Sequence, residues 1–269
     1  MTAPKLPVFF ISHGGGPWPW MHEQMGTTYD KLAESLASMP AQFGSVPPKA
    51  VLMISAHWEA PAFTVMANEH PPMLYDYGGF PEHTYRVKYP APGSPIWAHR
   101  VRDRIEAAGL ATALDEQRGF DHGCFSPMAV IYPDANVPVI QLSLKRGLDP
   151  AEHLALGRAL APLREEGVAI IASGLSYHNL RAFGAAGREA SAAFDQWLQR
   201  SLIGTDPAAR DAALIDWESA PAARQAHPRE EHLLPLMVAA GAAGDDAASL
   251  SYHEDAFMGS LTVSSYRFG

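Results

Sequence analysis

Three histidines each follow a short apolar run, a pattern typical of a side chain at the end of a buried strand. The carboxyl ends of parallel strands meet at one edge of a sheet, where α/β proteins bind their ligands. Neutral imidazole is a good ligand for Fe(II), Zn(II) or Cu(II), and metal sites draw ligands from distant parts of a chain. The sequence therefore predicts a metal site at this edge. The three are His13 after residues 7–11, His57 after residues 50–54, and His178 after residues 168–172.

Two further histidines have surroundings that suit the same site. His122 lies in the turn-like segment GFDHG, and His232 opens an expected helix in HPREEHLLPL, where His227, Glu230 and Glu231 can also bind a divalent metal. Taken alone, each histidine is as well explained as a hydrogen-bonded turn residue, and the metal interpretation depends on their convergence. The remaining histidines lack such placement and are assigned surface or structural roles: His22, His70, His83, His99, His153 and His253.

Aromatic residues are concentrated near the first two histidines. Such residues usually form core, but in Gly- and Pro-rich loops beside a metal they could also wall an aromatic pocket. We therefore expect Trp18, Tyr77 and Phe80 to contact a substrate. The Gly-rich turn after His13 could instead cradle phosphate, but the spacing GxGxxG is absent, which makes this the weaker interpretation.

Strands that alternate with helices predict an α/β fold. We expect one domain over residues 1–269, with a mostly parallel or mixed central sheet flanked by helices. The C-terminal residues 248–253 and 260–268 resemble two strands joined by a short turn, which predicts an antiparallel pair. The other expected strands cover residues 7–11, 50–54, 63–66, 137–144 and 168–172, and the expected helices cover residues 29–39, 95–108, 150–166, 188–202 and 230–240.

Composition excludes several classes of function. The 269 residues carry a net charge of −9 and no cluster of Lys or Arg, which argues against nucleic-acid binding. No segment approaches the ~20 apolar residues of a membrane-spanning helix. The only cysteine, Cys124, has no intrachain partner for a disulfide, which suits the reducing cytoplasm. We expect a cytoplasmic protein with no nucleic-acid or membrane partner, and the oligomeric state stays open.

The sequence resembles the DODA-type extradiol ring-cleaving dioxygenases, which belong to the class III superfamily with the protocatechuate 4,5-dioxygenase catalytic subunits. The matching segments are collinear and cover nearly the whole chain. They are SHG at 12–14, SAHW at 55–58, PP at 71–72 with YDYGGFP at 75–81, YPAPGS at 89–94, GFDHG at 119–123, SG at 173–174 with HNL at 178–180, and EH at 231–232 with PL at 235–236.

The resemblance implies that His13, His57 and His232 bind the metal. It implies further that His122 and His178 act as acid and base, with His178 an additional ligand when zinc occupies the site. Related class III enzymes place Glu at the third position, so Glu230 or Glu231 is the alternative to His232. Fe(II) is the expected active metal, and Zn(II) can occupy the same ligands.

The expected reaction is extradiol cleavage of a small aromatic diol by dioxygen. His178 is expected to take a catechol proton and His122 to orient and protonate oxygen, since histidine exchanges protons near neutral pH. Arg86, Lys88 and Arg181 are candidates to meet a substrate carboxylate. Two alternatives remain: a zinc hydrolase that uses the same histidines, and a non-catalytic metal-binding relative.

Overall fold

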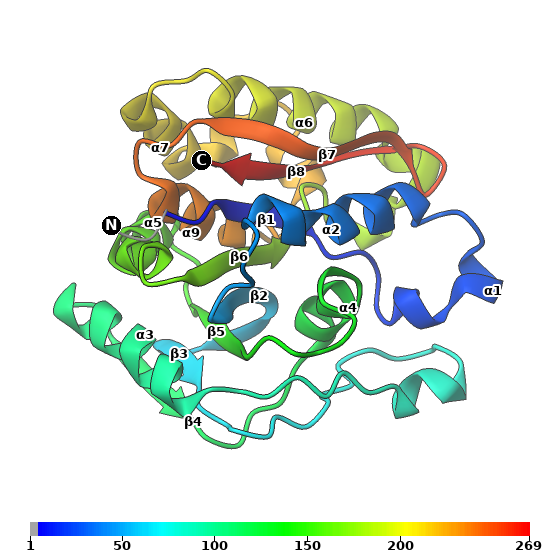
Figure 1. Cartoon of the computed structure of the whole chain (residues 1–269). Helices are drawn as coiled ribbons and strands as arrows, with labels where there is room; N and C mark the ends of the chain where they lie inside the picture. Colours follow the sequence, from blue (N-terminus) through cyan, green and yellow to red (C-terminus); the bar gives the residue numbers. More distant parts are fainter. Residues whose placement is uncertain (1–4) are drawn as a thin grey trace.

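The strands form one mixed sheet, seen in Figure 1 with helices packed against it. In the computed structural model, which describes residues 5–269, this sheet has eight strands in the order β4-β3-β5-β2-β6-β1-β8-β7. The central strands β5, β2, β6 and β1 run parallel, and β8 and β7 extend the sheet as an antiparallel pair. The predicted α/β class, mixed sheet and C-terminal pair are confirmed.

The bounds of the elements fix where each candidate residue lies. The strands are β1 Val8–Ser12, β2 Ala50–Ala60, β3 Phe63–Met66, β4 Thr112–Asp115, β5 Val139–Lys145, β6 Val168–Gly174, β7 Ala248–Phe257 and β8 Leu261–Phe268. The helices are α1 His22–Met25, α2 Asp30–Gln42, α3 Pro95–Ala107, α4 His122–Ile131, α5 Pro150–Leu160, α6 Arg188–Leu202, α7 Pro207–Ile215, α8 Ala223–Ala226 and α9 Leu234–Ala243.

Strand β4 and helix α4 are among the elements that were not predicted from the sequence. Strand β4 has only four residues and a weak strand composition. Helix α4 contains Gly123 and Pro127, which ordinarily break helices, yet nearly all of it is buried. Tertiary packing overrides local propensity here, so His122 begins a buried helix and does not lie in the expected turn.

Three predicted boundaries also need correction. Strand β2 does not end at residue 54 but continues to Ala60. The helix expected over residues 150–166 ends at Leu160 and tightens to a 3-10 turn around Pro162, which has no N–H to donate. Helix α9 begins at Leu234, with Pro235 in its first turn, so His232 precedes this helix and does not lie within it.

The core lies on both faces of the central strands. Helix α9 packs on β6, β1 and β2 with α5 beside it, while α4 packs on β2 and β6 from the opposite face with α2 beside it (Figure 1). Every residue of β1 and β6 is buried, as two-sided coverage of a parallel sheet requires. No helix within residues 5–269 is long and apolar enough to cross a bilayer.

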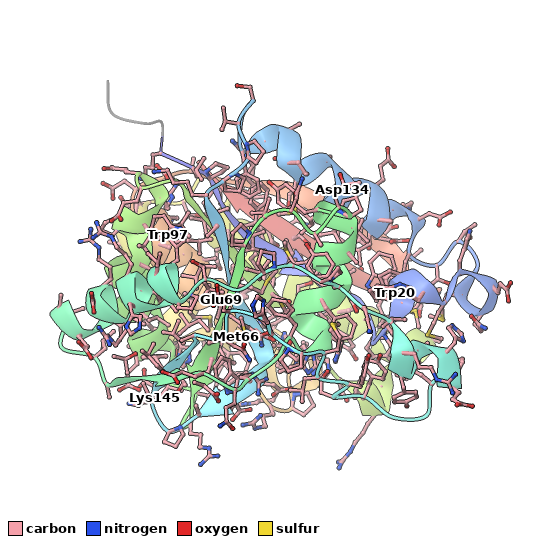
Figure 2. The ribbon with its side chains drawn as sticks, turned by 60° about the horizontal axis from the view of Figure 1, so that its bottom comes forward. Trp20, Met66, Glu69, Trp97, Asp134 and Lys145 are labelled. Carbon is pink, nitrogen blue, oxygen red and sulfur yellow. The ribbon has the colours of Figure 1, made fainter. Side chains whose placement is uncertain are left out.

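A long connection after β3 brings a remote segment toward the carboxyl edge of the sheet. In Figure 2 it leaves Met66, passes Glu69 and extends toward Trp20, while Trp97 of α3 lies at the other end of the view. The His83 Nε2 atom lies 3.0 Å from the Trp20 carbonyl oxygen, which ties the connection to the N-terminal segment. This route carries residues 75–80 over the ends of the parallel strands.

The contact between α5 and α9 depends on a glycine. A Cβ at Gly157 would overlap the carbonyl oxygen of Val238 and the nitrogen of Ala242, so the two helix backbones touch at this point. Alanine would gain about 1 kcal/mol of helix propensity. Overpacking costs typically about 1–3 kcal/mol, and more where the contact is with rigid backbone. The steric cost therefore exceeds the gain in helix propensity, and the substitution should destabilise the protein.

We therefore predict that Gly157→Ala lowers the free energy of unfolding by about 1–3 kcal/mol, measured by urea denaturation. Gly78→Ala is the matched control, because a Cβ there meets no atom within 4 Å and its φ is not positive. The control should stay within about 0.5 kcal/mol of the wild type. A Gly157→Ala protein as stable as the control would contradict the close approach of α5 and α9.

Candidate metal centre

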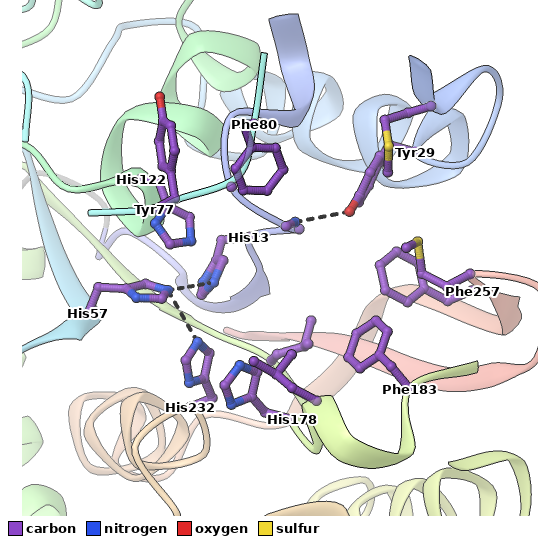
Figure 3. A pocket seen from close by; sticks show the side chains of 17 residues that line it. His13, Tyr29, His57, Tyr77, Phe80, His122, His178, Phe183, His232 and Phe257 are labelled. Carbon is purple, nitrogen blue, oxygen red and sulfur yellow. Dashed lines mark hydrogen bonds between the residues drawn. The ribbon is translucent and has the colours of Figure 1, made fainter. Parts of the chain in front are cut away.

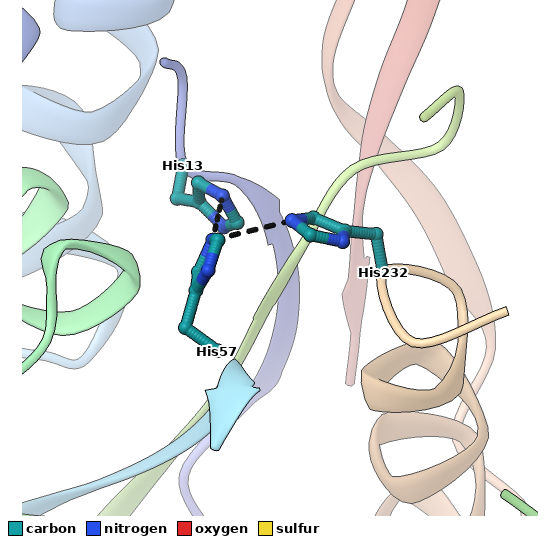
Figure 4. A group of neighbouring side chains, drawn as sticks. All are labelled: His13, His57 and His232. Atoms are coloured by element: carbon teal, nitrogen blue, oxygen red, sulfur yellow. Dashed lines mark hydrogen bonds between the residues drawn. The ribbon is translucent and has the colours of Figure 1, made fainter. Parts of the chain in front are cut away.

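The imidazoles of His13, His57 and His232 converge, as Figure 4 shows. The Nε2 atom of His57 lies 3.1 Å from Nε2 of His13 and 3.2 Å from Nε2 of His232. The candidate ligand atoms of all three lie within 4.8 Å of one another. Nitrogens that share a metal at ~2.1 Å are about 3.0 Å apart at a right angle and about 3.4 Å apart at the tetrahedral angle. The two measured separations fit ligands of one ion.

Strand register brings the first of these side chains to the edge of the sheet. Strands β1 and β2 flank β6, and their ends are level, because Ser12 pairs with Gly174 and Ser55 pairs with the residue before Gly174. His13 is the next residue after β1, and its N–H donates to the Gly174 carbonyl at 3.1 Å. The parallel topology therefore places His13 where the sequence predicted it.

His57 and His232 reach the same point by different local structures. The pairing of β2 with β5 shifts after Ser55, and His57 lies in the irregular stretch of residues 56–58. Bulges of this kind re-aim a side chain. His232 lies in the loop before α9, and its carbonyl accepts a hydrogen bond of 3.0 Å from the Leu175 N–H just beyond β6. This bond fixes the loop to the end of the strand.

A serine determines which nitrogen of His13 carries the proton. The Ser173 hydroxyl donates its only hydrogen to the Gly123 carbonyl, which can only accept. The Ser173 oxygen lies 3.0 Å from His13 Nδ1 and has no second hydrogen to donate, so it must accept a hydrogen bond from this nitrogen. His13 thus carries its proton on Nδ1 and presents a lone pair at Nε2.

Carboxylates fix the other two rings in the same way. Glu231 Oε1 lies 3.0 Å from His232 Nδ1, and Asp76 Oδ2 lies 3.4 Å from His57 Nδ1. The Glu231 carboxylate only accepts, so His232 carries its proton on Nδ1, and the ion-pair contact with Asp76 favours the same tautomer of His57. Three Nε2 lone pairs then face one another with no proton between them. A cation stabilises this arrangement, and metal-binding histidines characteristically have such partners on their second nitrogen.

Burial keeps the three imidazoles neutral. It is the largest cause that lowers the pKa of His13 and His232 well below 6.5, and the neighbouring histidines lower both further. Burial, followed by the charge of His122, lowers the pKa of His57 to about 3, although Asp76 opposes this shift. At pH 7 all three rings are therefore neutral, the form that binds a metal.

The two other predicted histidines lie beside this group and line the same cavity. The His122 ring centroid is 3.9 Å from that of His57, and His178 stacks on His232 at 3.4 Å between centroids. His122 Nδ1 lies 2.9 Å from Asp76 Oδ1, and His178 Nδ1 lies 3.1 Å from Glu231 Oε1. In both rings Nδ1 faces a carboxylate, so Nε2 is the nitrogen left to face the cavity.

Asp76 and Glu231 each bridge one ring of the convergent group and one neighbouring histidine. Burial raises the pKa of Asp76, but hydrogen bonds and charge from His122 outweigh it and lower the pKa overall. For Glu231, burial likewise raises the pKa, and the hydrogen bond from His178 reverses the shift. Both groups are thus ionised at neutral pH and serve as acceptors. Because both carboxylates engage Nδ1 atoms, Glu231 lies on the far side of His232 from the convergent nitrogens.

The five histidines occupy one side of a cavity of about 330 Å³ (Figure 3). Tyr77 and Phe80, predicted to contact substrate, line this cavity. Trp18, also expected to contact substrate, is not among the lining residues. Its ring stacks behind Tyr29 with 4.8 Å between centroids, and its Nε1–H donates to the His13 carbonyl at 2.7 Å.

The glycine run after His13 lets aromatic rings approach the backbone. A Cβ would overlap the Trp18 ring at Gly14, the Tyr29 hydroxyl at Gly15 and the Phe80 ring at Gly16. The first and last of these glycines also have positive φ, 81° and 53°, which other residues rarely adopt. The run is thus a packing surface for the wall of the cavity.

The remaining candidates have structural surroundings. Buried His227 lies with Nε2 3.0 Å from the Ser176 carbonyl and its ring centroid 5.2 Å from that of Phe194, and burial lowers its pKa to about 3. Glu230 pairs with Arg224. His57, Asp76 and His122, and likewise His178, Glu231 and His232, also lie close enough to hold an ion. Their carboxylates already take the Nδ1 protons, which makes them weaker metal sites.

Sequence reasoning missed several residues of the site. Asp76 was noted only within a matching segment, although a carboxylate between two aromatic residues in a loop was an available signal. Tyr29, Phe183 and Phe257 also line the cavity. They lie at the edges of regular elements. There the sequence pattern of an apolar residue is the same whether its side chain packs in the core or lines a pocket.

Comparison with known proteins identifies the family. The family described as the catalytic LigB subunit of aromatic ring-opening dioxygenase matches residues 7–269. A 4,5-DOPA dioxygenase extradiol from Beta vulgaris is 38% identical over 97% of this chain and 96% of its own length, and the dioxygenase tasH from Hapsidospora irregularis is 36% identical over 98% and 85%. A crystal structure of an uncharacterized protein from Escherichia coli K12 superposes with a TM-score of 0.76 at 30% identity, covering 98% of this chain and all of that one. The chain therefore belongs to the LigB family of aromatic ring-opening dioxygenases and is an oxidoreductase of the extradiol type.

Proposed function

We propose that the chain cleaves the ring of a catechol with dioxygen at an Fe(II) ion held by His13, His57 and His232. The observation that carries this proposal is the convergence of three Nε2 lone pairs, 3.1 and 3.2 Å from His57 to its neighbours, at one side of an aromatic-walled cavity. Three ligands on one face leave positions open for two oxygen donors and dioxygen. The parts of the site range from residue 13 to residue 258, so we propose that the whole chain acts as one catalytic domain.

Iron is the metal that this chemistry favours. When bound, Fe(II) supplies the redox activity that relieves the spin restriction between triplet dioxygen and a closed-shell aromatic. Zn(II) fits the same three imidazoles but has no redox chemistry. The lone buried Cys124 is consistent with action in the reducing cytoplasm.

His178 and His122 handle protons in this proposal. A catechol must lose protons to chelate, and both rings present an Nε2 acceptor to the cavity because Glu231 and Asp76 hold their Nδ1 protons. We assign the first proton to His178, which stacks on the ligand His232. His122, beside His57 and Tyr77, orients the oxygen and returns a proton to it.

Anaerobic reconstitution tests the reaction and its rivals. We predict that Fe(II)-loaded protein consumes dioxygen when given a panel of catechols that includes DOPA, the compound named for the beet relative. A yellow ring-opened product should accumulate in proportion to the oxygen consumed. Zn(II)-dependent ester hydrolysis without oxygen uptake would instead identify a hydrolase, and the absence of both would identify a non-catalytic relative.

Removal of one ligand should remove the metal but not the fold. We predict that His57→Ala loses most of its bound iron, measured by elemental analysis after gel filtration, while far-ultraviolet circular dichroism stays native. The core of a chain of this size does not need a metal to fold. His99→Ala, an exposed histidine of α3, is the control and should bind iron like the wild type. Loss of the fold together with the metal would make the site structural.

Removal of His122 should separate metal binding from turnover. We predict that His122→Ala keeps its iron and its affinity for catechol but slows turnover by about 10²–10⁴-fold, the usual scale for losing an acid or base. Single-turnover oxygen uptake measures the chemical step directly. Wild-type turnover in this variant would exclude His122 from proton transfer.

A further inference from the structure

The cavity wall that faces away from the histidines is apolar. In Figure 3 the imidazoles lie at one side and the rings of Tyr29, Phe183 and Phe257 at the other. Met25, Leu180 and Met258 also line the cavity. A catechol whose two oxygens meet the histidines must turn its opposite edge toward this wall. The ring substituent of such a catechol would therefore meet this wall.

Apart from the histidines, the described residues that line the cavity include no Asp, Glu, Lys or Arg. The sequence suggested three cations for a substrate carboxylate, and none of them is a lining residue. Arg86 pairs with Glu82, and Lys88 and Arg181 are exposed. Arg181 is the nearest in sequence, next to Leu180 at the cavity.

The polar groups of the wall, which are the Tyr29 hydroxyl and the backbone of the glycine run, are uncharged. The Gly15 N–H donates to Tyr29 Oη at 3.1 Å, which occupies a backbone donor of the glycine run. Burial raises the pKa of Tyr29 to about 12, so its hydroxyl carries no charge at neutral pH. A carboxylate or ammonium group placed here would lose water without gaining a partner of opposite charge.

We propose that the substrate is a catechol whose ring substituent is apolar and uncharged, so that catechols with a carboxylate or an amino-acid side chain bind poorly. This inference rests on the proposed function, because it assumes that the diol lies at the histidines. It distinguishes this chain from its relatives named as DOPA dioxygenases, whose name implies a substrate with an amino-acid side chain.

A binding experiment tests the selectivity without turnover. Zn(II)-loaded protein, which cannot carry out the redox reaction, is titrated calorimetrically with 4-butylcatechol, with 3-(3,4-dihydroxyphenyl)propanoate of similar length, and with DOPA. We expect 4-butylcatechol to bind at least about tenfold more tightly than either charged compound, the effect of an unpaired group losing its solvation. Equal or tighter binding of the propanoate or of DOPA would overturn the inference.

Substitutions in the apolar wall test where the ring substituent of a bound catechol lies. Phe183 is only partly buried, so Phe183→Arg should fold, and it should shift the ratio of affinities toward the propanoate by at least about tenfold. Phe183→Leu is the matched apolar control and should keep the wild-type ratio. An unchanged ratio in Phe183→Arg would contradict this placement of the substituent. A loss of propanoate binding in Arg181→Ala would show that Arg181 reaches the cavity and would likewise overturn the inference.

Failure of the proposed function would look different. If Fe(II)-loaded protein consumed no dioxygen with any catechol while the tenfold preference persisted in the Zn(II) titration, catechol cleavage would be refuted and the selectivity of the cavity supported. If oxygen uptake were fastest with DOPA, the reaction would be supported and the selectivity refuted.

Discussion

The site depends on polar contacts at Nδ1 that fix how five imidazole rings are oriented. Ser173, Asp76 and Glu231 lie beside the Nδ1 atoms of the five rings, and this leaves their Nε2 atoms directed toward one cavity. Without these acceptors each ring could turn its N–H inward, and the three convergent nitrogens would repel a cation. Asp76 lies between His57 and His122, and Glu231 lies between His232 and His178, so the orientations of the two rings in each pair are coupled.

The strands of the sheet position some of these residues, and the loops position the others. Parallel pairing with β6 levels the ends of β1 and β2, and a bulge in β2 turns His57 inward. The loop before α9 and the long connection after β3 supply His232 and Asp76 from far away in the sequence. Glycines at positions 14–16 let aromatic rings pack directly against the backbone beside the cavity.

Sequence reasoning recovered the features that regular structure dictates. His13 could be placed because it directly follows a buried parallel strand, and family resemblance added His232. The extension of β2 past residue 54 could not be foreseen, since a bulge depends on pairing with β5. Helix α4 was missed because Gly123 and Pro127 disfavour it locally, and only burial compensates. That Trp18 packs behind Tyr29 and does not line the cavity could not be foreseen, because this relation is set by tertiary contacts.

The convergence of the three Nε2 atoms on one ion can be observed directly. Anomalous diffraction at the iron edge, from crystals loaded anaerobically with Fe(II), locates the metal and its ligands. We predict a single peak about 2.0–2.3 Å from the Nε2 atoms of His13, His57 and His232, with the Nδ1 atoms still bound to their acceptors. An iron peak between Glu231 and His178, or one bound through Nδ1 of any of the three rings, would contradict this arrangement.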